Sequence, residues 1–180
     1  MKEISLHILD IVHNSITAGA DLIEVTVVED KKEDILSFEV SDNGKGMSQE
    51  VLKKVIDPFT THRTTRKVGL GIPLTKLACE VSGGSFEITS KLGIGTKVKA
   101  VFGYSNIDRQ PLGDMAQTMH QLITSFEDID FLYTHKIGDK EFVADTKSIK
   151  EVLGGVSLRE NEISLWLMDY LAEAENEINQ

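Results

Sequence analysis

The segment Asp42-Asn43-Gly44-Lys45-Gly46 constrains the possible fold more than any other part of the sequence. It follows residues 35–40, where apolar and polar side chains alternate as in a half-buried strand. It precedes Ser48, which is suited to cap a short helix over residues 51–56. A plain strand-to-helix joint needs only a turn residue or two. Because two glycines here leave the backbone bare beside a carboxylate, the joint is predicted to lie against a flat ligand.

Hydrophobic periodicity predicts helices and strands on both sides of this joint. Before residue 105 it predicts a helix over residues 3–18, strands over 22–28 and 35–40, a helix over 69–82, and a hairpin over 85–91 and 95–103. Residues 57–68 have no clear period and are rich in Thr and Arg, which predicts a loop. After residue 105 it predicts a helix over 111–126, a small hairpin over 131–137 and 141–143, and helices over 147–153 and 158–178.

Composition narrows the classes of protein to consider. The chain has 180 residues, 41% hydrophobic and 27% charged, as is typical of soluble globular proteins. It has no signal-peptide pattern and no apolar run near the roughly 20 residues of a membrane span. The single cysteine, Cys79, fits a reducing compartment. We therefore expect a cytoplasmic protein without a membrane partner.

Most of the negative charge lies in the last part of the chain. Lys and Arg number 13 against 14 Asp and Glu in residues 1–104, but 6 against 15 in residues 105–180. A net charge of −10 argues against a nucleic-acid partner, because phosphate contacts need clustered Lys and Arg. The charge step predicts a boundary between a domain of residues 1–104 and an acidic domain of residues 105–180. The apolar side chains between Leu158 and Leu171 either complete a small core, which is the favoured interpretation, or dock a protein partner.

Four features of residues 1–104 are suited to one ligand. They are Asn14 with Asp10 and Ala18 one helical turn away on either side, Asp42 with Gly44 and Gly46, Gly69 with Gly71, and Gly95 with Thr96. A carboxylate at a strand end can accept a hydrogen bond from an amine. Glycines that open a helix leave N–H groups free, and the helix dipole adds to their preference for phosphate. Each feature is weak alone, but the order of all four is specific.

In this order the features resemble the GHKL superfamily of ATP-binding proteins, which includes histidine-kinase catalytic domains, DNA gyrase B, MutL and the anti-sigma kinases. Residues 57–98 look like the second half of a histidine-kinase catalytic domain, whereas HNSITAGAD is similar to the first ATP-binding motif of MutL. The resemblance covers residues 1–104. It implies an α+β fold, a two-layer α/β sandwich of the Bergerat type, with a small α/β extension at the C-terminus.

The resemblance also implies that ATP and Mg²⁺ are bound, and by which residues. Asn14 would bind the Mg²⁺ and Asp42 would accept the adenine amino hydrogen. Asp10 would be either the catalytic carboxylate or a residue that only orders Mg²⁺-bound water. Residues 57–68 would form a lid that reaches phosphate through cationic side chains, Arg66 among them. Thr96 would hold Asp42 or its water. The full set of further cofactor-binding residues is Ala18, Gly44, Gly46, Met47, Thr60, Thr61, Arg63, Lys67, Gly69, Leu70, Gly71, Ile72 and Thr96.

Two departures from the superfamily leave the activity open. Its histidine kinases carry the acceptor histidine beside an acid on a helical hairpin, which is not expected here, and His120 lacks that acid. Its ATP-hydrolysing members use a Glu where this chain has Asp10, one methylene shorter. We interpret the chain as an ATP-dependent kinase or an ATPase that acts on a separate protein partner. A slow ATP-hydrolysing switch and a non-catalytic nucleotide sensor are the alternatives, and the oligomeric state is left open.

Overall fold

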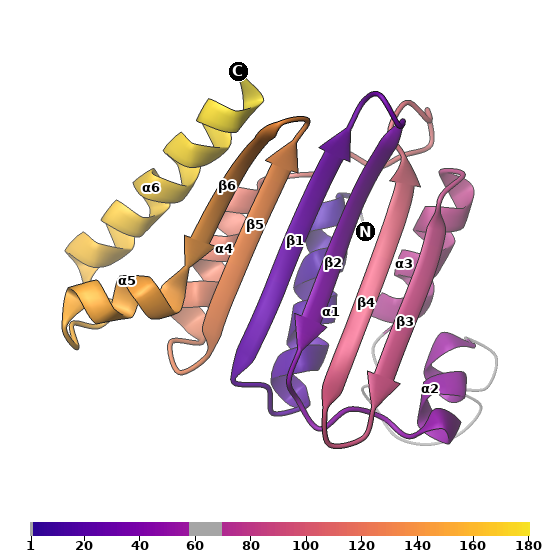
Figure 1. The fold of residues 1–180 in the computed structure, drawn as a ribbon, viewed down its shortest axis with the longest axis horizontal. Coiled ribbons are helices and arrows are strands. Elements are labelled where there is room, and N and C mark those ends of the chain that lie inside the picture. The colour runs from indigo at the N-terminus through magenta and orange to yellow at the C-terminus, as the bar shows by residue number, and fades with distance from the viewer. Residues whose placement is uncertain (1, 58–69) are drawn as a thin grey trace.

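The computed structural model describes residues 2–57 and 70–180, which build one mixed six-stranded sheet in the order β3-β4-β2-β1-β5-β6 (Figure 1). Neighbouring strands are antiparallel except β1 and β5, which are parallel. The strands are β1 (Leu22–Asp30), β2 (Ile35–Asp42), β3 (Ser85–Lys91), β4 (Gly95–Gly103), β5 (Asp130–Ile137) and β6 (Lys140–Asp145). The helices are α1 (Ile4–Thr17), α2 (Gln49–Ile56), α3 (Gly71–Val81), α4 (Met115–Ser125), α5 (Thr146–Leu153) and α6 (Asn161–Asn179).

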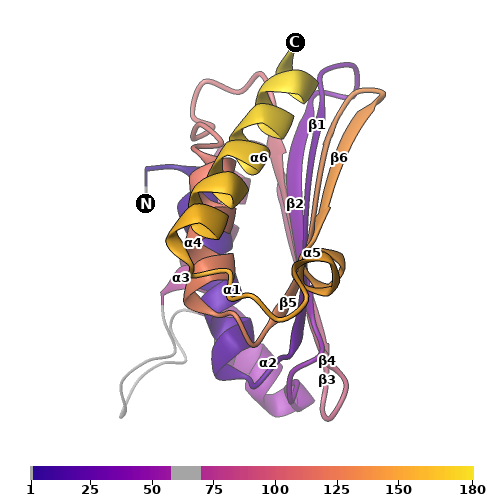
Figure 2. The same ribbon diagram turned by 90° about the vertical axis from the view of Figure 1, so that its left-hand side faces the viewer.

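The helices α1, α3, α4 and α6 lie together on one face of the sheet (Figure 2). This arrangement confirms the expected two-layer α+β sandwich. Alternation in the strands explains it: in β1, Ile23, Val25 and Val27 are buried beneath the helices, while Glu24 is exposed on the other face. None of the helices in the described residues is both long and apolar enough to cross a bilayer.

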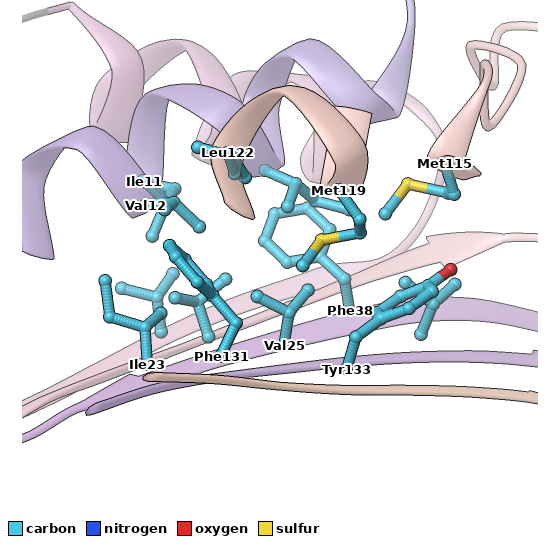
Figure 3. Packing of buried hydrophobic residues seen from close by; sticks show 14 of the residues in the cluster. Ile11, Val12, Ile23, Val25, Phe38, Met115, Met119, Leu122, Phe131 and Tyr133 are labelled. Atoms are coloured by element: carbon cyan, nitrogen blue, oxygen red, sulfur yellow. The ribbon is translucent and has the colours of Figure 1, made fainter. Parts of the chain in front are cut away.

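The core lies between the helical layer and the inner face of the sheet (Figure 3). Val12 of α1 and Met119 of α4 pack above side chains of the central strands. Phe38 of β2 and the β5 residues Phe131 and Tyr133 are almost fully buried there. Because the core draws on β5 and α4 as well as on α1 and β2, residues before and after position 105 share it.

Local capping explains where two helices begin. Ser48 accepts a hydrogen bond from the Val51 N–H (3.3 Å), so the predicted helix after the glycine-rich joint is confirmed. The helix predicted over residues 111–126 begins later, at Met115, because the Asp114 side chain caps it by accepting from the Gln117 N–H (2.8 Å).

The C-terminal part continues the sheet. Strand β5 pairs along all of β1 except its last residue, from Leu22 opposite Asp130 to Glu29 opposite Ile137. The boundary between residues 104 and 105 stays a prediction, and it falls just past β4 in a sheet that both parts share.

The apolar side chains between Leu158 and Leu171 divide between two faces of the structure. Leu158, Leu167 and Leu171 are buried in the core, which agrees with the packing interpretation. Leu165 and Trp166 are exposed instead.

A buried charged cluster ties α6 to the sheet. His135 of β5 is only 1% exposed, and its Nδ1 lies 2.7 Å from a Glu175 carboxylate oxygen of α6. Its Nε2 lies 3.1 Å from a carboxylate oxygen of Glu29 in β1. Tyr133 donates to the other Glu175 oxygen (2.6 Å). Burial alone lowers the pKa of His135, but the hydrogen bonds and charges of Glu175 and Glu29 outweigh it and raise the pKa to about 9.

We predict that this cluster makes the free energy of unfolding depend on pH. A folded pKa of about 9 lies above the ordinary value of 6.5, so the stabilisation is complete below pH 6.5 and is lost as the pH rises through 9. Its size is about 3 kcal/mol at most. Urea unfolding of wild type and His135→Gln at several pH values measures it. The stability difference between the two should shrink toward pH 9.5, and a difference independent of pH would show that His135 is neutral.

Candidate functional site

A cavity of about 230 Å³ opens where α1, α2 and α3 meet the ends of β2, β3 and β4. Its walls are mostly apolar. The lining side chains of this kind are Ile11, Met47, Val51, Val55, Ile72, Ile88 and Val98. Polar groups come from a few positions only, chiefly Asn14, Ser15, Asp42 and Thr96. An apolar slot with a few convergent polar groups is typical of a site for a small planar ligand.

The carboxylate of Asp42 is held in the cavity by two hydrogen bonds. Ser15 Oγ of α1 donates to one of its oxygens at 2.6 Å, and the Gly44 N–H donates to the other at 2.8 Å. Each carboxylate oxygen has two lone pairs, so Asp42 retains capacity to accept from a ligand amine. Asp42 therefore lines the cavity, while its predicted role as an acceptor for adenine stays a prediction. Ser15 is a cavity residue that the sequence interpretation did not include. Its signal was its place beside Asn14 in the motif-like segment HNSITAGAD.

The glycines of the joint make room for other parts of the protein itself, and their predicted role in the approach of a ligand stays a prediction. A Cβ on Gly44 would lie 2.9 Å from both the Cβ and the carbonyl oxygen of Ala18. Gly46 has φ +65°, and a Cβ there would lie 2.0 Å from the Lys91 carbonyl oxygen. The bare backbone thus admits the end of α1 on one side and the β3–β4 turn on the other. The Lys45 N–H, which donates to the Ala18 carbonyl (2.9 Å), fixes the same approach.

Thr96 lies opposite Asp42 in the β2–β4 register, as a shared role requires. Its hydroxyl, however, lies 2.8 Å from Ser90 Oγ of β3, and Ser90 also accepts from the Met47 N–H (2.8 Å). Among the described residues the hydrogen bonds to Asp42 come from Ser15 and Gly44, so a direct bond from Thr96 is not formed. The expectation that Thr96 holds a water of Asp42 stays a prediction.

The polar face of α1 runs from the cavity toward the start of α3. Asn14 and Ala18 line the cavity, as expected from their spacing. Asp10, one turn earlier, lies beside the first residue of α3: a Cβ on Gly71 would be 3.3 Å from Asp10 Oδ2. Within residues 2–57 and 70–180 no side chain caps the N-terminus of α3, which begins at Gly71 beside Asp10. Leu70, which precedes α3, is exposed.

The predicted site residues divide into those outside the described part of the chain and those at the cavity. Thr60, Thr61, Arg63, Arg66, Lys67 and Gly69 lie outside the described residues. Of the remaining predicted residues, Asn14, Ala18, Asp42, Gly46, Met47, Ile72 and Thr96 line one cavity. Gly44 is not among the lining residues but donates to Asp42, which is, and Asp10 lies against Gly71, the neighbour of the lining residue Ile72.

Comparison with known protein families shows the family to which this chain belongs. The model of the family described as "Histidine kinase-, DNA gyrase B-, and HSP90-like ATPase" matches residues 2–105, more than half of the chain. The chain belongs to this ATPase family. Its first part is therefore an ATP-binding domain of the histidine-kinase, DNA gyrase B and HSP90 type, which confirms the resemblance to the superfamily drawn from the motifs.

Similar sequences within the family are sensor proteins. The chain is 32% identical over 96 residues to the sensor protein KdpD of Clostridium acetobutylicum, a match that covers 51% of this chain and 10% of the relative. It is 39% identical over 85 residues to the sensor protein SrrB of Staphylococcus aureus, which covers 44% of this chain and 14% of the relative. The chain thus spans a small part of the length of these relatives.

Solved structures share the fold at low identity. The ATPase domain of Aquifex aeolicus MutL complexed with ADP has a TM-score of 0.55 and 15% identity, with 86% of this chain and 70% of that chain covered. The N-terminal domain of a DNA repair protein also has a TM-score of 0.55, with 16% identity and 89% and 56% coverage. Since 86% of the chain exceeds what residues 2–105 supply, the shared fold extends beyond β4.

We predict that the joint tolerates no side chain at Gly46. Gly46→Ala should lower the free energy of unfolding by about 3 kcal/mol, because its Cβ would overlap the Lys91 carbonyl and its φ is positive. Gly93→Ala is the matched control: it also has a positive φ (+78°), but no atom lies within 4 Å of its Cβ, so it should cost about 1 kcal/mol. Urea denaturation measures both. Equal losses would mean that the joint is looser than described.

Proposed function

We propose that the chain binds Mg-ATP in this cavity and acts on a separate protein partner as a regulatory kinase or ATPase. The observation that carries the proposal is Asp42, a carboxylate at the end of an apolar slot that is oriented by Ser15 Oγ and the Gly44 N–H. Membership of the ATPase family supports the nucleotide, and the similar MutL ATPase domain was solved in complex with ADP.

The apolar end of the cavity suits adenine. Ile11, Ile72 and Val98 come from three different elements and present aliphatic walls to a planar ring. Asp42 supplies an acceptor for the exocyclic amine, and its two existing hydrogen bonds fix where that amine must lie. The specificity for adenine over guanine would follow, because guanine presents a carbonyl oxygen at the corresponding ring position and would leave Asp42 facing another acceptor.

The other end suits phosphate and Mg²⁺. No hydrogen-bond partner of the Asn14 side chain occurs within residues 2–57 and 70–180, so its amide oxygen is available to a hard cation. The same part of the chain holds no group of three His, Cys, Asp or Glu side chains able to bind a metal ion. Mg²⁺ would therefore be held by Asn14 together with phosphate oxygens and water, the ligand set that this ion prefers. When bound, it would neutralise phosphate charge, while the free N–H groups of α3 would contact the phosphates.

Asp10 is the carboxylate nearest the proposed phosphate end. It lies against Gly71 at the start of α3, where it would orient water bound to Mg²⁺ or accept a proton from a nucleophile. We propose that the nucleophile of a kinase reaction belongs to another protein. Within the described part of the chain, His7 and His135 are buried and hydrogen-bonded, and His120 Nε2 lies 2.9 Å from Ser164 Oγ. His13 is exposed and its ring meets Phe126 edge to face at 5.6 Å.

A helix face next to the phosphate end supports a protein partner. Leu70, Leu74, Leu77 and Val81 recur at helical spacing along α3, and all four are exposed. Leu77 is 53% exposed and Leu70 69%. This stripe begins where the γ-phosphate would lie, so a protein that packs on it would bring its own side chains near that phosphate.

A slow ATP-hydrolysing switch or a nucleotide sensor is the second candidate. It is favoured by Asp10, whose side chain is one methylene shorter than the Glu of hydrolysing relatives, and by a fold likeness to MutL that continues past β4. In this version the bound nucleotide would change the surface offered to a partner without transfer of phosphate.

We predict that Asp42→Asn weakens binding of ADP by about tenfold to a hundredfold, because it removes a charged acceptor. Asp139→Asn, in the exposed β5–β6 turn, is the matched control and should leave binding unchanged. Isothermal titration calorimetry measures both, with urea denaturation to check that the variants fold. Unchanged ADP affinity in a folded Asp42→Asn protein would contradict the adenine assignment.

The fate of the γ-phosphate separates the two candidates. We predict that γ-labelled ATP, added with the chain to a lysate of the source organism, labels a separate protein and leaves this chain unlabelled. The Asn14→Ala variant should abolish labelling by loss of the Mg²⁺ ligand. Release of free phosphate without protein labelling would support the ATPase version, and neither product would support the sensor.

A further inference from the structure

The outward face of α6 combines acidic and large apolar side chains. Glu162, Leu165, Trp166, Asp169, Glu173, Asn176 and Glu177 recur at helical spacing and are all exposed. We call this set the α6 face. Leu165 is 60% exposed and Trp166 46%. From Glu162 to Glu177 the face is about 22 Å long, or four helical turns. The opposite side of α6 is buried through Leu167, Leu171 and Ile178.

Trp166 is held in place by a series of aromatic contacts. Its ring stacks on Tyr170 with a centroid distance of 5.4 Å and an interplanar angle of 9°. Tyr170 meets Phe142 of β6 edge to face at 5.6 Å, and Phe142 meets the buried Tyr133 at 6.1 Å. A tryptophan supported in this way needs little ordering on binding, and tryptophan is enriched among the residues that dominate binding energy in interfaces.

The charge of the face selects its partner. Four of its seven residues are acidic, and α6 contains no Lys, Arg or His. A second copy of this chain, an anionic membrane and a nucleic acid would each bring negative charge against it. A segment with Lys and Arg around an apolar centre would instead pair with the acids while covering Trp166 and Leu165.

We propose that the α6 face is a docking surface for a basic amphipathic helix of another protein. A helix suits it because the apolar pair lies one turn from acids on both sides, a spacing that a second helix of the same period matches. The inference goes beyond the proposed function and stands without it. The α6 face lies over β5 and β6, at the other end of the sheet from the nucleotide cavity, and shares no residue with it (Figure 1).

Trp166 is the only tryptophan of the chain, so its fluorescence reports on this face alone. The probe is a synthetic amphipathic helix of leucine and lysine, about four turns long to match the face. The full chain should show a blue-shifted, saturable change in tryptophan emission with this peptide, weakened by added salt. Asp169→Lys combined with Glu173→Lys should raise the dissociation constant about tenfold, because two attractions become repulsions.

Glu33→Lys combined with Asp139→Lys, two charge reversals in the exposed β1–β2 and β5–β6 turns, is the matched control and should bind as wild type. Leu165→Ser should also weaken binding while it leaves every charge in place, which keeps the test valid if the charge-reversed variant does not fold. Four results would overturn the proposal. These are no change in emission with the peptide, an equal change with a leucine–glutamate peptide, a shift with protein concentration alone, and a shift with anionic vesicles.

Discussion

The carboxylate of Asp42 joins the two layers of the molecule. Through its backbone it ends β2, where it pairs with Ile23 of β1 and Thr96 of β4. Through its side chain it receives Ser15 of α1 and the N–H of Gly44 in the joint. The same group that closes the sheet against the helices thus defines one end of the cavity. Because hydrogen bonds from the helix layer and from the joint both hold this carboxylate, the direction of its remaining lone pairs toward a ligand is fixed.

The close approach of backbone segments around the joint also restricts the shape of the cavity. Gly46 and Gly95 both have positive φ values, and a Cβ on either would overlap a carbonyl oxygen, that of Lys91 and that of Asp42 respectively. The joint is therefore clamped between α1 and the β3–β4 turn. Rigid backbone around a cavity reduces the ordering that a ligand must impose, which is the usual reason for placing a binding site on fixed elements.

Local signals predicted much of this architecture. The alternation in residues 85–91 and 95–103, the cap at Ser48 and the helical face of Asp10, Asn14 and Ala18 are all contained in short windows, and the structure has each of them. Three features were out of reach of such windows. The parallel pairing of β1 with β5 joins segments about a hundred positions apart. The bond from Ser15 to Asp42 and the close approach of Lys91 to Gly46 depend on how complete layers pack, which local propensity does not encode.

Packing also decides how the two ends of the molecule can communicate. The proposed nucleotide cavity and the α6 face share no side chain, so any influence of one on the other must pass through the elements between them. One buried polar connection leaves the α3 end: Thr75 donates to the Gly71 carbonyl (2.7 Å) and lies 2.9 Å from His7 Nδ1, and His7 Nε2 lies 2.7 Å from Gln110. Burial lowers the pKa of His7 below its ordinary value. Gln110 stands at the start of the segment that leads into α4, and α4 packs against α6. The first turn of α3 is thus linked to the C-terminal helices by buried hydrogen bonds and helix packing, in addition to the sheet that both regions share.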